Sequence, residues 1–299
     1  MIFKLLACIY TAGATYSEAA RKMLGILERK FSITSDILGE FTGDIESINA
    51  VVKEYCGHIV ILGYWQRGFK KQEVSLAVKP SRIGLEYSYG VFRKNLHMLA
   101  EVAKKHGVFL WVDAEKREDR YIITDLIIRE RALGFDNVGA AIQCVHSDAK
   151  VFLEKLLKWN IAVRFVKGAY TDCDLKKDAD IVVNYMDCFW TALYHFKNSA
   201  VKSTVAVATH DKKLIDYALR FREIDPDVAP IIQIQMLYGI RVKLQRELIA
   251  LYPGILIYVP WGSDRIGFLK RRLKEGIHPS AIWLFLRNIF EALRYNDLK

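Results

Sequence analysis

The sequence has no uninterrupted apolar run of the roughly 20 residues that a membrane-spanning helix requires. It also lacks disulfide spacing, because its five cysteines are odd in number and form no CxxC pair. Free thiols of this kind favour a reducing compartment. The apolar stretch before Cys8 is too short for the core of a signal peptide. We therefore expect a cytoplasmic protein without a transmembrane segment.

Several catalytic motifs are missing as well. No GxSxG turn is present, and no serine ends a predicted strand beside a plausible base, which argues against a Ser-His-Asp hydrolase. No GxGxxG follows a strand, so loops would have to hold any dinucleotide. Histidine, cysteine and carboxylate residues do not gather at ligand spacing, so we predict no metal site.

What the chain does have is positive charge and a large apolar fraction. Its 299 residues are 52% hydrophobic and carry a formal net charge of +10. That charge suggests anionic partners: a substrate, cofactor phosphates or acidic lipid. Lysine and arginine are spread among acidic residues rather than clustered with exposed aromatics, so we do not expect a nucleic-acid partner.

Eight short apolar stretches alternate with segments of helical periodicity. The predicted strands are 32–41, 74–79, 108–115, 137–144, 161–167, 204–210, 231–237 and 255–259. The predicted helices are 17–29, 44–55, 89–106, 122–133, 148–158, 178–198, 211–222, 242–251 and a last one after residue 262. Buried strands separated by helices indicate a parallel sheet, and eight such units in this length indicate an α/β protein with a (β/α)8 TIM barrel. We expect a helical lead-in at 1–31 and one barrel domain at 32–299.

The stretch 255–276 predicts a buried strand, a Pro260-Trp261-Gly262 turn and a helix capped by Ser263 or Asp264. One face of that helix carries an aromatic ring, two guanidinium groups and a carboxylate, from Phe268, Arg271, Arg272 and Glu275. Such a face could form a lid over an anionic ligand. Taken alone, a solvated face with an Arg271–Glu275 ion pair is the more common structure.

Polar residues stand where the predicted strands end, which is where barrel enzymes hold their active sites. They are Glu40, Lys79, Asp113, Gln143, Arg164, Lys167, Thr209, His210, Gln235 and Tyr258. Each has a simpler explanation: Lys79 could reach solvent, Asp113 or Glu115 could cap a helix, Gln143 could be a satisfied core amide, and His210 could lie in a turn. Together they would be costly to desolvate without a ligand. Because cations outnumber acids, that ligand should be anionic or phosphorylated.

Five motifs resemble the proline dehydrogenase family, monofunctional type, which also forms the flavin domain of the proline-utilisation proteins. They are VKGAY at 166–170, ATHD at 208–211, QMLYGIR at 235–241, YVPWG at 258–262 and LKRRLKEG at 269–276. They occur in the family's order and spacing, from about residue 32 onward. The resemblance implies a distorted barrel that binds FAD, with its last helix over the mouth.

It also implies an activity: hydride transfer from L-proline to flavin N5, giving 1-pyrroline-5-carboxylate, with electrons passed to a membrane quinone. A peripheral contact with the inner face of the membrane is then expected. Proline catabolism would begin with this step.

The resemblance implies roles for individual residues. Lys79, Arg271 and Arg272 would bind the substrate carboxylate, and Asp113 would be the counter-ion of Lys79 and Arg164. The catalytic set is therefore Lys79, Asp113 and Arg164. The side chains implied to wall the proline ring are Tyr170, Leu237, Tyr258 and Phe268. The residues implied to bind FAD are Gln143, Arg164, Lys167, Gly168, Ala169, Tyr170, Thr209, His210, Gln235 and Glu275, the last of which also braces Arg271. Glu40 would pair with the arginines as a gate.

Two positions depart from the family: Phe268 stands where tyrosine is usual, and Trp261 is bulkier than the common residue. Two other classes of function are also compatible with the residues. One is a Schiff-base aldolase on the same fold with Lys79 or Lys167 as nucleophile. The other is a basic module that binds nucleic acid or anionic membrane.

Overall fold

The computed structural model describes residues 7–39, 43–168, 173–252 and 254–275, with side chains as far as residue 270. Its eight strands follow one another in chain order around a closed parallel barrel, which confirms the predicted (β/α)8 fold. The chain divides into two compact units. The first comprises Met1–Glu40, Phe69–Val74 and Gln235–Lys299, and the second comprises Phe41–Gly68 and Ser75–Ile234.

The elements alternate as the sequence predicts. The strands are β1 (Ser32–Leu38), β2 (Val74–Val78), β3 (Phe109–Val112), β4 (Val138–Gln143), β5 (Val163–Val166), β6 (Val205–Ala208), β7 (Ile232–Leu237) and β8 (Leu256–Gly262). The helices are α2 (Tyr16–Glu28), α3 (Ile45–Gly68), α4 (Tyr89–His106), α5 (Arg120–Ala132), α6 (Ala149–Leu157), α7 (Asp178–Asn198), α8 (Lys212–Ile224), α9 (Val242–Leu251) and α10 (Arg265–Glu275), with a short 3-10 turn η1 (Pro80–Ile83).

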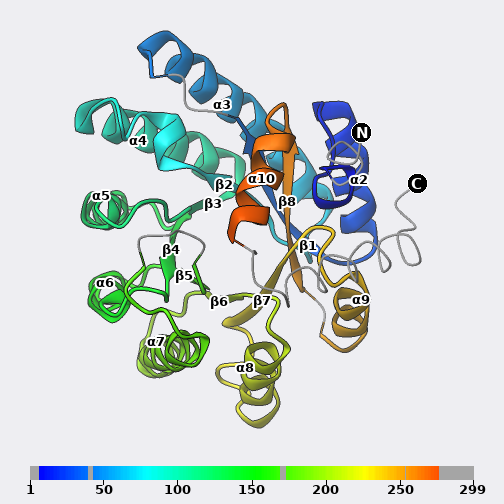
Figure 1. Ribbon diagram of the computed structural model, residues 1–299, viewed down its shortest axis with the longest axis vertical. Helices are drawn as coiled ribbons and strands as arrows, with labels where there is room; N and C mark the ends of the chain where they lie inside the picture. Colours follow the sequence, from blue (N-terminus) through cyan, green and yellow to red (C-terminus); the bar gives the residue numbers. More distant parts are fainter. Residues whose placement is uncertain (1–6, 40–42, 169–172, 253, 276–299) are drawn as a thin grey trace. The chain divides into compact units, whose positions relative to one another are not determined.

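In the second unit, helices α5, α6 and α7 lie outside strands β3, β4 and β5 (Figure 1). The interior side of these strands is filled by Trp111 of β3, which packs against Ala162, just before β5, and Ala206 of β6. Gly139 of β4 leaves room for this ring, since a Cβ there would lie 2.9 Å from the Trp111 side chain. One large ring among small residues therefore fills the interior beneath the strand ends.

Helix α3 is longer than the predicted helix 44–55, which was wrong at its C-terminal end because the helix continues to Gly68. The continuation buries Ile59, Leu62 and Trp65. A Cβ at Gly63 would lie 2.7 Å from the backbone oxygen of His106, at the end of α4. The missing side chain of Gly63 thus lets α3 lie close to the end of α4.

In the first unit, β8 pairs with β1 on one side and with β7 on the other. The predicted turn at Pro260-Trp261-Gly262 is wrong, because these residues continue β8 and pair with Asp36, Ile37 and Leu38. A proline is tolerated there because its carbonyl faces away from β1 and accepts a hydrogen bond from the Ala12 amide at 2.8 Å. No amide hydrogen of the β1 ladder is therefore lost.

The N-terminal segment that precedes α2 packs against the start of α10 within the first unit. Ile9 and Tyr10 share an apolar cluster with Leu38, Phe268 and Leu269. The Gly262 amide donates to the Gly13 carbonyl at 3.0 Å, so the segment also binds the end of β8. The helical lead-in is thus present as α2, while its status as a separate domain stays a prediction.

Helix α10 begins as expected, because the Asp264 carboxylate accepts a hydrogen bond from the Gly267 amide at 3.1 Å.

Among the described helices, none is both long and apolar enough to cross a membrane.

Candidate functional site

Within the second unit, the predicted polar residues stand at the carboxyl ends of successive parallel strands. They are Lys79 after β2, Asp113 after β3, Gln143 at the end of β4, Arg164 in β5, Lys167 after β5, and Thr209 with His210 after β6. In a parallel barrel these ends share one rim. The strand order brings these residues to successive positions of that rim, and the convergence of their side chains on one ligand stays a prediction.

Arg164 is the most buried cation of this rim, with 2% of its surface exposed. Its Nη1 donates to Asp113 Oδ1 at 3.2 Å. Its guanidinium carbon lies 4.5 Å from the centroid of the Trp111 ring. A planar cation that is fixed from the side by a carboxylate and from below by an aromatic face has little freedom to reorient. The implied ion pair between Asp113 and Arg164 is present; its role in catalysis stays a prediction.

The turn that follows Lys79 is anchored by Glu115. Both carboxylate oxygens accept from Ser81, one from its amide at 2.6 Å and the other from its hydroxyl at 2.7 Å. Burial raises the pKa of Glu115, although the Ser81 hydrogen bonds and the nearby Lys79 oppose that shift. The alternative that Asp113 or Glu115 caps α5 is wrong, since Asp119 occupies the cap position.

Lys167 joins the starts of two helices. Its ammonium donates to Asp178 of α7 at 2.7 Å and to Asp211, the N-cap of α8, at 2.9 Å. Burial by itself would lower the Lys167 pKa, but the two carboxylates outweigh it and raise the pKa above its ordinary value. Desolvation likewise opposes ionisation of Asp211, and Lys167 overcomes it, so the Asp211 pKa is lowered. Thr209 accepts from the Asp211 amide at 3.1 Å.

Gln143 is 4% exposed, and its Oε1 lies 3.2 Å from Nε2 of the fully buried His146. The other ring nitrogen of His146 faces Asp174 at 3.3 Å. Asp174 also accepts from the amide and hydroxyl of Ser147 and pairs with Arg117 at 2.6 Å. The alternative that Gln143 is a satisfied amide is therefore correct for its oxygen.

Gly168 has a φ of 118°, in the region that L side chains rarely adopt. A Cβ at this position would also meet the Val145 side chain at 2.5 Å. The backbone after β5 therefore requires glycine for two separate reasons. Ala169 and Tyr170 lie outside the described residues.

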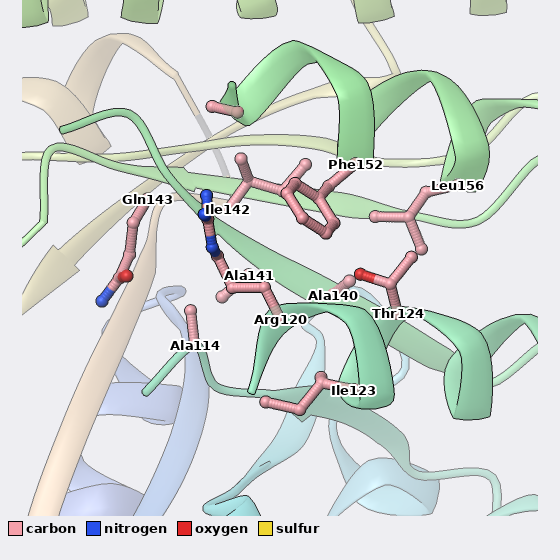
Figure 2. Close-up of a pocket in the computed structure, with 11 residues that line it drawn as sticks. Ala114, Arg120, Ile123, Thr124, Ala140, Ala141, Ile142, Gln143, Phe152 and Leu156 are labelled. Carbon is pink, nitrogen blue, oxygen red and sulfur yellow. The ribbon is translucent and has the colours of Figure 1, made fainter. Parts of the chain in front are cut away.

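A pocket lies between β4 and helices α5 and α6 (Figure 2), and Gln143, at the end of β4, is the one predicted site residue among those described that lines it. Its walls are mainly apolar, and they include Arg120, Ile123, Phe152 and Leu156. Arg120 is already neutralised by a bidentate pair with Asp148 at 2.7 and 3.1 Å, and it lies 4.6 Å from the Phe152 ring centroid. This pocket is therefore unlike the cationic site that the sequence predicts.

Within the first unit, Leu237 of β7 and Tyr258 of β8 are register partners, so their side chains leave the same face as neighbours. Gln235 is 2% exposed two residues earlier on β7. Phe268 is 5% exposed and packs in the cluster with Ile9 and Tyr10. Glu40 lies outside the described residues, as do the side chains of Arg271, Arg272 and Glu275.

Three residues of these surroundings were not predicted from the sequence. They are Trp111, His146 and Asp174. Trp111 sits inside a strand that the pattern assigns to the core, which gives no signal of a polar neighbour. Among the described residues, no group of three or more His, Cys, Asp or Glu side chains could hold a metal ion.

A closed parallel barrel with a buried, fixed guanidinium group among the polar residues of its strand ends defines a barrel enzyme. The comparison with known families identifies which one. The family described as proline dehydrogenase matches residues 19–281, and the chain belongs to this family of oxidoreductases. That match confirms the resemblance inferred from the five motifs, and with it the enzyme class.

Individual relatives agree. The chain is 28% identical over 272 residues to "Proline dehydrogenase 1" of Bacillus subtilis subsp. natto, covering 89% of this chain and 85% of that protein. It is 26% identical over 278 residues to "Proline dehydrogenase" of Deinococcus radiodurans, covering 89% and 84%.

A solved structure supports the fold alone. Proline utilization A from Bdellovibrio bacteriovorus, inactivated by N-propargylglycine, matches with a TM-score of 0.81 at 19% identity. The match covers 93% of this chain and 33% of that chain, so the present chain spans about a third of that longer protein.

Proposed function

We propose that this protein catalyses the FAD-dependent oxidation of L-proline to 1-pyrroline-5-carboxylate, the first step of proline catabolism. Membership of the proline dehydrogenase family supports the reaction class. The observation that carries the proposal is the arrangement of Arg164 within β5, where it is buried and held by Asp113 and Trp111.

The residues present fit a flavin. Three successive strand ends offer an amide, a guanidinium group, a hydroxyl and an imidazole, from Gln143, Arg164, Thr209 and His210. Gly168 sets the course of the backbone after β5, because its φ of 118° and the Val145 side chain beside it both exclude a larger residue. When bound, FAD supplies the hydride acceptor.

Arg164 provides the electrostatics of the proposed reaction. Its guanidinium group is desolvated and cannot swing away, so its charge acts in a medium of low dielectric constant without reorganisation. Asp113 holds the group in place. A cation in this position would stabilise the negative charge that the hydride acceptor gains when the substrate is oxidised.

Lys79 is proposed to bind the proline carboxylate, and Glu115 fixes the turn from which it projects. Arg271 and Arg272 are proposed to bind the same carboxylate, and Glu40 to pair with them in a gate. Leu237, Tyr258, Phe268 and Tyr170 are proposed to wall the proline ring. The register pairing of Leu237 with Tyr258 supports a shared wall. A membrane quinone is the proposed electron acceptor, with contact at the inner face of the membrane.

The test is a visible spectrum of the purified protein before and after anaerobic addition of L-proline. A yellow protein whose flavin absorbance falls with L-proline, and not with glycine, is the expected result. Colourless protein that takes up no added FAD would contradict the proposal. So would flavin that L-proline leaves oxidised.

The aldolase alternative is weakened for one of its two candidate lysines. A Schiff-base lysine must lose its proton near neutral pH, and this requires a lowered pKa. Lys167 has a raised pKa and is held by two carboxylates. Lys79 is then the remaining candidate for a Schiff-base lysine. Borohydride trapping of a carbonyl substrate on Lys79 would favour the aldolase over the flavoenzyme.

A further inference from the structure

The loop between β4 and α6 holds a buried imidazole whose position is fixed from several sides. His146 is 0% exposed. The side chain of Asn184, on α7, donates to the carbonyls of both Cys144 and His146 at 2.8 Å. These two bonds fix the backbone on either side of Val145, so the imidazole projects from a rigid loop.

Asp174 determines what one nitrogen of this ring must do. Desolvation opposes ionisation of Asp174, but the Ser147 hydroxyl and amide, His146 and Arg117 outweigh it and hold the pKa of this carboxyl well below its usual range. An ionised carboxylate only accepts hydrogen bonds. The Nδ1 of His146, 3.3 Å from Asp174 Oδ1, must therefore carry a proton and donate it.

The other ring nitrogen determines the orientation of an amide. His146 Nε2 lies 3.2 Å from Gln143 Oε1, and an amide oxygen also only accepts. Each ring nitrogen of His146 therefore faces an oxygen that accepts, Asp174 Oδ1 on one side and Gln143 Oε1 on the other. Figure 2 shows the Gln143 amide directed away from Phe152 and Leu156, the apolar residues of the neighbouring pocket. With its oxygen bound to His146, Gln143 keeps its NH2 group as the donor for any ligand at the rim.

We propose that His146 is a positioning residue: braced by Asp174, it fixes the Gln143 amide so that the NH2 group, and not the oxygen, faces the flavin. This inference rests on the proposed function for the identity of the ligand. The hydrogen bonds among Asp174, His146 and Gln143 do not depend on the proposed function. A donor at this position suits the carbonyl and ring-nitrogen acceptors of an isoalloxazine, and a reversed amide would set acceptor against acceptor.

The arrangement can be tested without turnover. In the full chain labelled with nitrogen-15 histidine, before and after flavin removal, we expect one buried imidazole whose Nε2 carries a hydrogen. Its signals should vanish in His146→Leu and persist in His195→Leu. A bare Nε2 on this ring would overturn the proposal, because Gln143 would then have to present its oxygen to the rim.

His195→Leu is the matched control, since His195 Nε2 makes the same kind of contact, 3.1 Å from Asn160 Oδ1, at the far end of α7. In His146→Leu we expect FAD to bind about tenfold more weakly, the loss of roughly one hydrogen bond. The flavin spectrum should shift and kcat should fall, with the KM for proline unchanged. FAD affinity, spectrum and kcat all equal to those of His195→Leu would contradict the proposal.

If His146→Leu does not fold, Asp174→Asn preserves the side-chain volume and removes the charge that fixes Nδ1. It should reproduce the spectral shift and weaken FAD binding in the same direction; unchanged binding would contradict the positioning role. If the wild-type flavin is not reduced by proline, the proposed function fails, while the nitrogen-15 measurement still decides the orientation of Gln143.

Discussion

Trp111 lies directly beneath Arg164, with the guanidinium carbon 4.5 Å from the ring centroid. The two residues come from β3 and β5, which are separated by β4 in the strand order. The small side chains of Ala162 and Ala206 leave the space that the indole fills. The ring therefore supports the cation from below, while Asp113 holds it from the side.

Replacing Arg164 by methionine should remove the charge at the rim and keep most of the volume. We expect the rate of flavin reduction by proline to fall about a hundredfold, as when a preorganised donor to a developing charge is lost. Asp113, whose side chain is 18% exposed, would lose its cation. The free energy of unfolding should therefore fall by about 1–3 kcal/mol. Stopped-flow absorbance and urea denaturation measure the two effects.

Arg120→Met is a matched control. Arg120 also pairs with an aspartate and stacks on an aromatic ring, but it lies between β4 and the outer helices (Figure 2). The Arg120→Met variant should lose about 1 kcal/mol of the free energy of unfolding, because the partner Asp148 is 35% exposed. Its rate of flavin reduction should be unchanged. Equal kinetic losses in both variants would remove Arg164 from the site.

The ion pair between Lys167 and Asp211 should make the free energy of unfolding depend on pH in the acid range. The folded-state pKa of Asp211 is below its ordinary value of 3.8, so the bridge stabilises the fold above that pH and the effect is lost as pH falls through the folded value. The raised pKa of Lys167 acts at the other end, where stability is lost only above about 10.5. We expect Asp211→Asn to be less stable than wild type at pH 7 and equal to it in strong acid.

Asp211→Ala separates the charge from the helix cap. Asparagine caps as well as aspartate does, but alanine leaves the Lys213 amide without its side-chain acceptor. The alanine variant should therefore be about 1 kcal/mol less stable than the asparagine variant at both pH values. Thermal melts at pH 7 and in strong acid would show this, and a difference between the two variants that changes with pH would argue against the assignment.

Much of this fold can be predicted from local pattern, because each strand is a short apolar run and each is followed by helical periodicity. The prediction failed where a residue typical of one structure serves another. Pro260 continues β8 because its missing donor faces away from β1, and Gly63 lies within α3 because α4 crosses closely there. Both depend on a neighbouring element that is distant in the sequence.

The polar residues of the rim could be predicted from the sequence, but the buried residues that hold them in place could not. Asp113 follows β3 and Arg164 lies within β5, close to the strand ends where a barrel collects polar groups. Trp111 and His146 act through partners 53 and 28 residues away, a separation set by strand order and loop path. A tryptophan in an apolar strand is indistinguishable from ordinary core until the opposite strands are placed.

Ile9 should stabilise the start of α10. Its side chain is 8% exposed in the cluster with Tyr10, Leu38, Phe268 and Leu269. We expect Ile9→Ala to cost about 2 kcal/mol through lost burial and an unfilled cavity. Because α10 carries the arginines proposed to bind proline, the KM for proline should rise more than kcat falls. The side chain of Ile224 is 73% exposed, so Ile224→Ala should change neither the free energy of unfolding nor the KM for proline. Unchanged hydrogen exchange in α10 of Ile9→Ala would contradict the packing role.

Gly168→Ala should disturb the rim through two separable effects. The φ of 118° is strained for alanine, at about 1–3 kcal/mol, and the new Cβ would meet the Val145 side chain at 2.5 Å. Removing that side chain relieves the clash and leaves the strain. The double variant with Val145→Ala should therefore lose less stability than the sum of the single losses.

Gly25→Ala provides the control for Gly168→Ala. Gly25 lies within α2, and no neighbouring atom comes within 4 Å of the place that a Cβ would take, so alanine there should gain about 0.5–1 kcal/mol. The measurement is urea denaturation of all four variants, together with FAD affinity. FAD affinity should fall in Gly168→Ala and recover in part in the double variant, because relief of the Val145 clash lets the backbone after β5 return toward its position. Strict additivity of the stability losses would show that Val145 does not confine Gly168.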